Sequence, residues 1–186
     1  FREQLADAVG KGIAEFGHLD IVCANAGILP IKPPHSAQQF VDAVDVEGVS
    51  EIVAVAVATD EFENDACQAA VEALIASRRP RVTLLGFTVN SMGYGPAVAA
   101  KLGLGFASDV HAVALEGDAV VATRSFYGSK VSAELEFPGT DGVLLLLRPT
   151  TWAPAEGGGG AAVSSLEVTP GPSRARHLEF VERIAA

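Results

Sequence analysis

The sequence predicts an α/β fold: a three-layer αβα domain with a mainly parallel central sheet and an antiparallel β appendage. Apolar runs of strand length alternate with helix-like segments up to about residue 105, as a parallel sheet covered by helices requires. From Asp109 onward the segments are short, with Gly-containing turns between them. The 186 residues, 49% of them hydrophobic, suffice for one core but not for two comfortable domains.

The first segments predict a helix, a strand and a second helix. Apolar residues recur at helical spacing over residues 1–16, and Gly17 is a natural stop. The run LDIVCA, residues 19–24, has the pattern of a buried strand. After a loop rich in Pro, Ser36 is a candidate N-cap for a helix over residues 37–44.

Two further strand–helix pairs follow. The Val-rich run over 51–58 predicts a parallel strand covered on both faces, and one arrangement places residues 19–24 beside it. A helix over 60–79, capped by Thr59 or Asp60, has an acidic first turn and a basic end that suit the helix dipole. The sequence then predicts a buried strand over 81–87 and a helix over 91–103.

The remaining segments predict mostly antiparallel strands. Gly117 and Asp118 form a turn signal between two alternating runs. VLLLLR, residues 143–148, is unbroken in its apolar character and suits a central strand. We expect residues 154–162, which contain four consecutive glycines, to form a flexible loop, and residues 168–186 to form an exit linker and a short helix.

Charge and cysteine content exclude several function classes. The net charge is −10 with a pI near 4.8, and no cluster of Lys and Arg suits the phosphates of nucleic acid. No apolar run approaches the roughly 20 residues that span a bilayer, so we expect no membrane insertion. Cys23 and Cys67 lie in a strand-like and a helix-like run, which argues against disulfides and favours a reducing, cytoplasmic location.

Asn25, Ala26 and Gly27 end the first strand in LDIVCANAGI and suggest a cofactor turn. Small residues at the carboxyl end of a strand let the backbone approach a dinucleotide closely. Residues 1–46, including FVDAVDV, resemble short-chain dehydrogenases/reductases. That resemblance implies NAD(P) bound near Asn25 and Gly27, whereas the plainer interpretation is a strand-to-loop turn.

The rest of a dehydrogenase site is missing. No Gly-rich phosphate-binding turn precedes the motif. Tyr127 and Lys130 are three residues apart, whereas that family places its catalytic Tyr and Lys four apart on one helix face. The residues that follow alternate with a period of two, which predicts a strand. We therefore predict no catalytic residue. The sequence leaves open whether the chain is an enzyme, and these observations count against enzymatic activity.

A longer resemblance covers residues 47–186. The stretches AVEALIASRRPRVTLLGFTVNSMGYGPAVAAKLGLGFASDV (70–110) and VVATRSFYGSKVSAELEFPGTDGVLLLLRPTTWAPAEGGGGAAV (120–163) resemble the N-terminal domain of the alpha subunit of electron-transfer flavoproteins. The resemblance implies a heterodimeric electron carrier in which FAD is held mainly by a separate C-terminal domain, which would follow residue 186. It also implies a beta subunit that carries AMP and a dehydrogenase that donates electrons.

The two resemblances divide the chain into three parts: residues 1–46, a domain over 47–172, and an exit segment over 173–186. Either the first part supplies the domain's own strand and helices, or the chain is a chimera. The leading hypothesis is a non-catalytic docking domain of a flavoprotein electron carrier. The alternatives are a fragment of an NAD(P)-dependent short-chain dehydrogenase and joined segments without activity.

One loop and two arginines are candidate binding features. Backbone N–H groups in GFTVNSMGYGP could hold an anion or nucleotide, although a plain strand-to-helix turn fits the same residues. Arg124 and Arg148 lie in apolar strands, where an arginine forms an interface salt bridge or simply faces solvent. The four histidines lack the spacing of metal ligands, so we predict no metal site. The predicted anion loop comprises Gly86, Thr88, Ser91 and Gly93.

Overall fold

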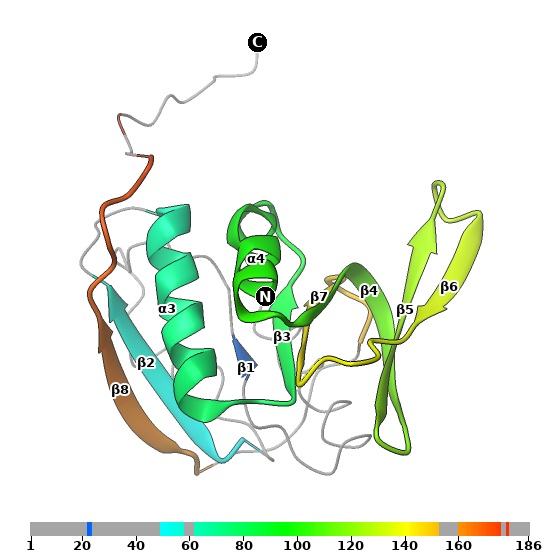
Figure 1. Ribbon diagram of the computed structural model, residues 1–186, viewed down its shortest axis with the longest axis horizontal. Coiled ribbons are helices and arrows are strands. Elements are labelled where there is room, and N and C mark those ends of the chain that lie inside the picture. Colours follow the sequence, from blue (N-terminus) through cyan, green and yellow to red (C-terminus); the bar gives the residue numbers. More distant parts are fainter. Residues whose placement is uncertain (1–21, 24–48, 58–61, 153–159, 176–177, 179–186) are drawn as a thin grey trace.

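The computed structural model describes residues 22–23, 49–57, 62–152, 160–175 and 178. Within these residues the chain forms a six-stranded sheet, a two-stranded sheet and two helices (Figure 1). The elements are β1 (Val22–Cys23), β2 (Glu51–Val57), α3 (Asn64–Arg78), β3 (Val82–Gly86), α4 (Val89–Leu102), β4 (Gly105–Glu116), β5 (Ala119–Phe126), β6 (Val131–Leu135), β7 (Val143–Leu147) and β8 (Ala162–Val168).

The larger sheet has the order β1-β3-β7-β4-β5-β6. Its first four strands pair in parallel, and β4-β5-β6 continue it as an antiparallel meander. This confirms the predicted fold class, since the sheet is mixed and mainly parallel, consistent with a three-layer α/β fold. The antiparallel strands are the far half of the same sheet rather than a separate appendage (Figure 1).

Strand β7 forms the centre of the core. All five of its residues are buried, as expected of an apolar strand covered on both faces. Alternate leucines face opposite sides, because successive strand residues point to opposite faces. Leu145 and Leu147 pack with Val110 and Ala122 in one cluster, while the other face packs against the helices. The cluster under the helices comprises Cys67, Ile75, Leu85, Tyr94, Val98, Ala99, Leu144 and Leu146.

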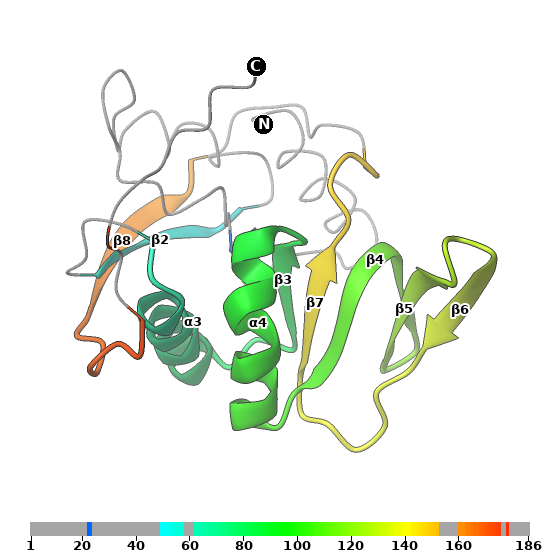
Figure 2. The same cartoon turned by 90° about the horizontal axis from the view of Figure 1, so that it is seen from above.

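The two helices lie on one face of the strands (Figure 2). α3 begins at Asn64, later than predicted, and ends as predicted before Pro80, with Arg79 in the left-handed conformation. α4 begins at Val89 and ends at Leu102, and Gly103 caps it with a φ of 67° that suits glycine. α4 contacts β3, β7 and β4, and α3 contacts β2 and β8.

Strand β2 corrects a prediction. The run over 51–58 does form a parallel strand, but it pairs with β8 in a separate two-stranded sheet. Its described side chains are partly or fully exposed, so the strand is not covered on both faces. Residues 22–23 pair with β3, which overturns the arrangement that placed 19–24 beside 51–58. In β2 the alternating residues Ala54 and Ala56 are exposed, and their small side chains leave little apolar surface to bury.

Strand β8 was not predicted. Its residues, AVSSLEV, lie between the predicted loop and the predicted exit linker, and their two serines and glutamate weaken the apolar pattern. The seven residue pairs from Glu51↔Ala162 to Val57↔Val168 are in register. Several predictions concern residues outside the described part of the chain. They are the helices over 1–16 and 37–44, the caps Ser36, Thr59 and Asp60, and the short terminal helix.

An ion pair fixes the segment that follows β8 to the start of α3. Asp65 accepts hydrogen bonds from the backbone N–H of Arg174 at 2.6 Å and from its Nη2 at 2.5 Å. These hydrogen bonds, and the positive charge behind them, lower the pKa of Asp65 to about 2. The predicted acidic helix start therefore has a definite partner about 110 residues later in the chain.

Candidate docking surface at the carboxyl edge of the sheet

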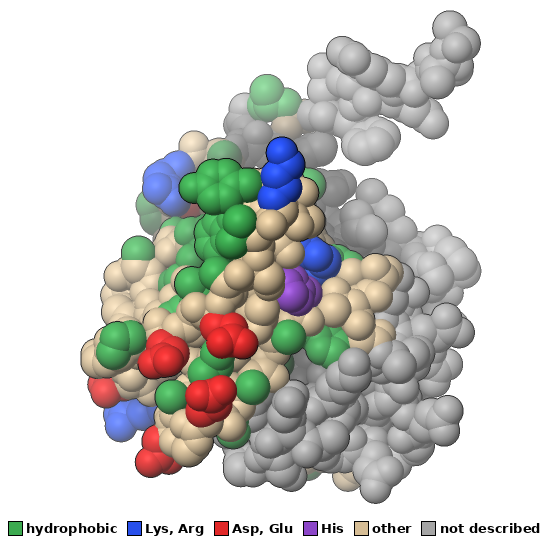
Figure 3. All heavy atoms as spheres, turned by 90° about the vertical axis from the view of Figure 1, so that its right-hand side faces the viewer, with side chains coloured by type: hydrophobic (Ala, Val, Ile, Leu, Met, Phe, Trp, Pro, Cys, Tyr) green, Lys and Arg blue, Asp and Glu red, His purple; other side chains and the backbone are tan. Residues whose placement is uncertain are grey.

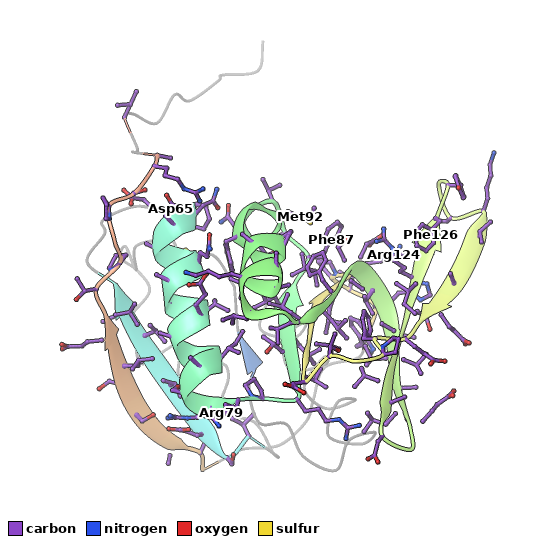
Figure 4. All side chains as sticks on the ribbon, in the orientation of Figure 1. Asp65, Arg79, Phe87, Met92, Arg124 and Phe126 are labelled. Carbon is purple, nitrogen blue, oxygen red and sulfur yellow. The ribbon has the colours of Figure 1, made fainter. Side chains whose placement is uncertain are left out.

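We use the name carboxyl edge for the residues at the C-terminal ends of β3 and β7, the bulge in β4 and the end of β5: residues 86–92, 108–111, 124–127 and 148. Open α/β sheets place their ligand sites at this edge. Figure 4 shows Met92, Phe87, Arg124 and Phe126 along it. The predicted anion loop and both candidate arginines therefore lie at one end of the sheet.

The hydroxyls of the predicted anion loop are engaged within the loop itself. Ser91 donates its backbone N–H to Thr88 Oγ1 at 3.1 Å, and Thr88 donates its backbone N–H to Ser91 Oγ at 2.9 Å. Ser91 is fully buried, and its Oγ also lies 2.6 Å from the carbonyl oxygen of Gly86. This reciprocal cap satisfies two backbone donors that an anion would need.

The two glycines of the loop have different roles. A Cβ at Gly86 would meet nothing closer than 3.9 Å, so the chain does not require glycine there for space. A Cβ at Gly93 would lie 2.3 Å from the Asn64 side chain. Gly93 therefore lets α4 pass close to the first residue of α3, which is a packing role. Anion binding by these four residues stays a prediction.

A bulge in β4 positions a paired arginine. The register of β4 shifts between Ala107 and Val110, and Asp109 adopts a positive φ of 59°. Arg148, directly after β7, donates Nε to Asp109 Oδ1 and Nη2 to Oδ2, both at 2.8 Å. This two-point hydrogen bonding lowers the pKa of Asp109 below its usual value. Arg148 thus forms a salt bridge within the chain, at a partly exposed position.

Arg124 is held differently. Its guanidinium carbon lies 4.5 Å from the centre of the Phe126 ring, a cation–π contact. Its Nη1 lies 3.4 Å from Ser108 Oγ, a long contact for a charged donor. Its Nε is buried and makes no hydrogen bond. No ion pair of Arg124 occurs among the residues that the structure describes.

Large apolar side chains lie along the same edge as these charges. Val89 is 92% exposed, Met92 43% and Tyr127 82%, and Phe87, which packs against the core, is only partly buried. Figure 3 shows hydrophobic side chains running down from the upper end of the molecule beside Lys and Arg, whereas Asp and Glu gather below. Exposed large apolar groups near cationic side chains are typical of protein interfaces.

The predicted dehydrogenase residues do not form a site within the described part of the chain. Tyr127 and Lys130 both occupy the turn between β5 and β6, and Tyr127 has a positive φ of 52°. Asn25 and Gly27 lie outside the described residues. Among the residues described, no group of His, Cys, Asp and Glu is placed to hold a metal. No helix there is long and apolar enough to cross a membrane.

Sequence comparisons identify relatives of the chain. The family model of the electron transfer flavoprotein domain matches residues 29–171. The electron transfer flavoprotein subunit alpha of Methylophilus methylotrophus is 42% identical over 172 residues, which cover 92% of this chain. The chain spans about half (51%) of that relative's length.

The same comparisons bear on the N-terminal segment. An alignment that covers 92% of the chain extends into residues 1–46, and the family match begins at residue 29. The proposed short-chain dehydrogenase resemblance of that segment therefore has no support. Since the family model matches well over half of the chain and an alpha subunit is 42% identical across most of it, the chain belongs to the electron transfer flavoprotein family.

Proposed function

We propose that this chain is the docking scaffold of a flavoprotein electron carrier and performs no chemical step itself. It docks a beta subunit and an FAD-binding C-terminal domain, and the FAD of the assembled protein carries electrons from a dehydrogenase to an acceptor. Family membership and similarity to an alpha subunit support this assignment. The cytoplasmic location belongs to the same proposal, supported by the buried free thiol of Cys67.

One observation carries the docking role. At the edge where an α/β enzyme would present reactive groups, Thr88 and Ser91 cap each other and Arg148 is paired with Asp109. The groups left exposed there are apolar, with Val89 and Tyr127 almost fully exposed. A surface of this kind contributes buried apolar area on binding a protein, and it offers little to a small polar substrate.

The start of α4 lacks two of the backbone donors that a flavin pyrophosphate could use. A dinucleotide pyrophosphate is bound by free N–H groups at a helix N-terminus. At the start of α4 the cap occupies the N–H groups of Thr88 and Ser91, and Met92 and Val89 leave its first turn apolar and exposed. In this proposal FAD is bound by the C-terminal domain, and AMP by the beta subunit.

The experiment is to express the chain with the electron-transfer flavoprotein beta subunit of the same organism and measure complex formation by size-exclusion chromatography with light scattering. We expect a complex of one copy of each. The variant Val89→Glu places a charge in the apolar surface and should weaken the complex about tenfold or more. Its control is Val163→Glu on β8, which is also exposed (59%) and should bind like the wild type.

Cofactor binding by the chain alone is checked in parallel. Calorimetric titration with NADH should give no heat of binding, and the absorbance spectrum of the purified chain should contain no flavin bands. Binding of NADH, or a failure of the wild-type chain to bind the beta subunit, would contradict the docking assignment. Weak binding of AMP would instead indicate that the loop at 86–93 is an anion site.

A further inference from the structure

Arg124 has no ion-pair partner in the described part of the chain, and its buried Nε donor has no acceptor there. Its contact with Ser108 is long at 3.4 Å. No described residue accepts a hydrogen bond from its Nη2. Leaving a buried charged donor without an acceptor costs folding free energy, because the donor has lost its hydrogen bonds to water. Such a group therefore needs an explanation beyond stability.

The carboxylate of Asp109, whose pKa the charge of Arg124 helps to lower, already has a partner. Both oxygens of Asp109 accept from Arg148, at 2.8 Å each. Arg124 contributes to the lowered pKa of Asp109 only through its charge, after the hydrogen bonds and the charge of Arg148. The three side chains together carry one net positive charge in a protein whose formal net charge is −10. A second carboxylate would neutralise that excess.

The guanidinium of Arg124 is held ready for a ligand. Phe126 supports it at 4.5 Å, and the strand pairing of Arg124 with Val110 on β4 and Ala133 on β6 fixes its backbone. A guanidinium fixed by stacking loses less side-chain entropy on binding than a free one. Its planar donors match the two oxygens of a carboxylate.

We propose that Arg124 binds the carboxylate of an Asp or Glu side chain that the docked beta subunit presents to the carboxyl edge. This inference rests on the proposed docking function and names the chemistry of its central contact. The apolar side chains of the carboxyl edge exclude water around the pair, which strengthens it.

The surroundings favour a protein carboxylate over a phosphate. Val89, Met92 and Tyr127 offer exposed apolar surface to a partner, whereas a nucleotide phosphate would need several hydrogen-bond donors. The nearby Thr88 and Ser91 donors are used in the cap. Arginine beside aromatic residues is also the pattern of binding hot spots between proteins.

The test measures the affinity of the chain for the beta subunit by calorimetry at two salt concentrations. Arg124→Met should weaken binding about tenfold or more and reduce its salt dependence, because truncating one partner of a desolvated pair removes a charge contact. Arg124→Lys keeps the charge and loses the planar fork, so it should bind with intermediate affinity. Arg81→Met is the control, since exposed Arg81 precedes β3 at the opposite end of the sheet.

Charge reversal identifies the contact directly. Arg124→Glu should abolish binding, and an Asp→Arg or Glu→Arg change at one position of the beta subunit should restore it. The thermal midpoint of Arg124→Met should equal or exceed that of the wild type, because the variant removes a buried unsatisfied donor. A lowered midpoint would indicate a structural role for Arg124 and would contradict the proposal.

The outcomes separate the two proposals. A wild-type chain that does not bind the beta subunit contradicts the docking function itself. Wild-type binding with undiminished affinity in Arg124→Met overturns only the carboxylate contact. Weakened binding that no acidic position of the partner can rescue also overturns it. Both chains are also titrated with inorganic phosphate. If the wild type binds phosphate and Arg124→Met does not, while both bind the beta subunit equally, the ligand of Arg124 is a free anion and the carboxylate contact is overturned.

Discussion

The carboxylate of Asp109 accepts two hydrogen bonds from Arg148, and this pair determines what Arg124 can do. With Asp109 committed, Arg124 has only a cation–π contact and one long contact to a hydroxyl. The sequence singled out both arginines as interface or surface residues. It could not separate them, because Asp109 is 39 residues from Arg148 and becomes its neighbour only through parallel pairing of β4 and β7.

Replacing Asp109 by Asn tests the internal pair. Asn tolerates the positive φ of 59° at this position, so the change removes the charge with little backbone strain. The pKa of Asp109 is lowered in the folded chain. Its contribution to stability is therefore present above the unfolded pKa, about 3.9, and is lost as the pH falls through the lower folded value.

The measurement is the thermal midpoint of wild type and Asp109→Asn at pH 7 and at successively lower pH. We expect the variant to have the lower midpoint at pH 7 and the two midpoints to converge below about pH 4. Glu134→Gln, at an exposed position on β6, is the control and should leave the midpoint unchanged. A constant difference across the pH range would contradict the assignment.

At the scale of elements, local signals predicted most of the structure. The unbroken run Leu144–Leu147 identified the central strand, and Gly103 and Pro80 identified where helices end, since only local chemistry is needed for each. The alternation after Tyr127 correctly predicted a strand instead of a catalytic helix. The start of α3 was misplaced, because several acidic residues before Asn64 could each begin a helix.

Truncating the central strand tests its place in the core. Leu145 is fully buried in the cluster with Val110 and Ala122. Leu145→Ala should lower the free energy of unfolding by about 2–5 kcal/mol, through lost burial and the cavity left behind. Val163→Ala on β8, where the side chain is 59% exposed, should change it by less than about 0.5 kcal/mol. Urea unfolding followed by circular dichroism measures both.

At the scale of the whole molecule, the sequence did not predict which strands pair. The apolar pattern of β2 suited a central strand, but which strands pair depends on competition among all of them. The partner β8 was not predicted, because its two serines and its glutamate weaken the apolar pattern of a strand. The anion loop had the composition of a binding turn. Its hydroxyls prove to be engaged in the cap of α4, which depends on side-chain rotamers that composition does not determine.

The two sheets should differ in local stability. β7 is fully buried, whereas the described side chains of β2 and β8 are partly or fully exposed. Backbone groups with little apolar cover open more easily. In hydrogen-exchange mass spectrometry we expect β2 and β8 to lose their protection together and before β7. Equal protection in all three strands would mean that the two sheets unfold as a single unit.

The pair of Asp65 and Arg174 provides a second whole-molecule test, since it joins the segment after β8 to α3. The pKa of Asp65, lowered to about 2, means that the pair stabilises the fold above the unfolded pKa of about 3.9 and loses its effect as the pH falls towards 2. Asp65→Asn should increase proteolytic cleavage near Arg174 at neutral pH. Cleavage identical to that of the wild type would contradict this anchoring role.

The pairing of β2 with β8 also has a consequence for synthesis. Glu51 and Ser164, joined across the small sheet, are 113 residues apart. At about 5–20 residues per second, a ribosome takes roughly 6 to 23 seconds to make the second strand after the first. For that interval a Val-rich strand has exposed backbone edges, the condition in which nascent chains associate wrongly. We therefore expect the yield of folded protein to depend on chaperones that shield β2 until β8 is made.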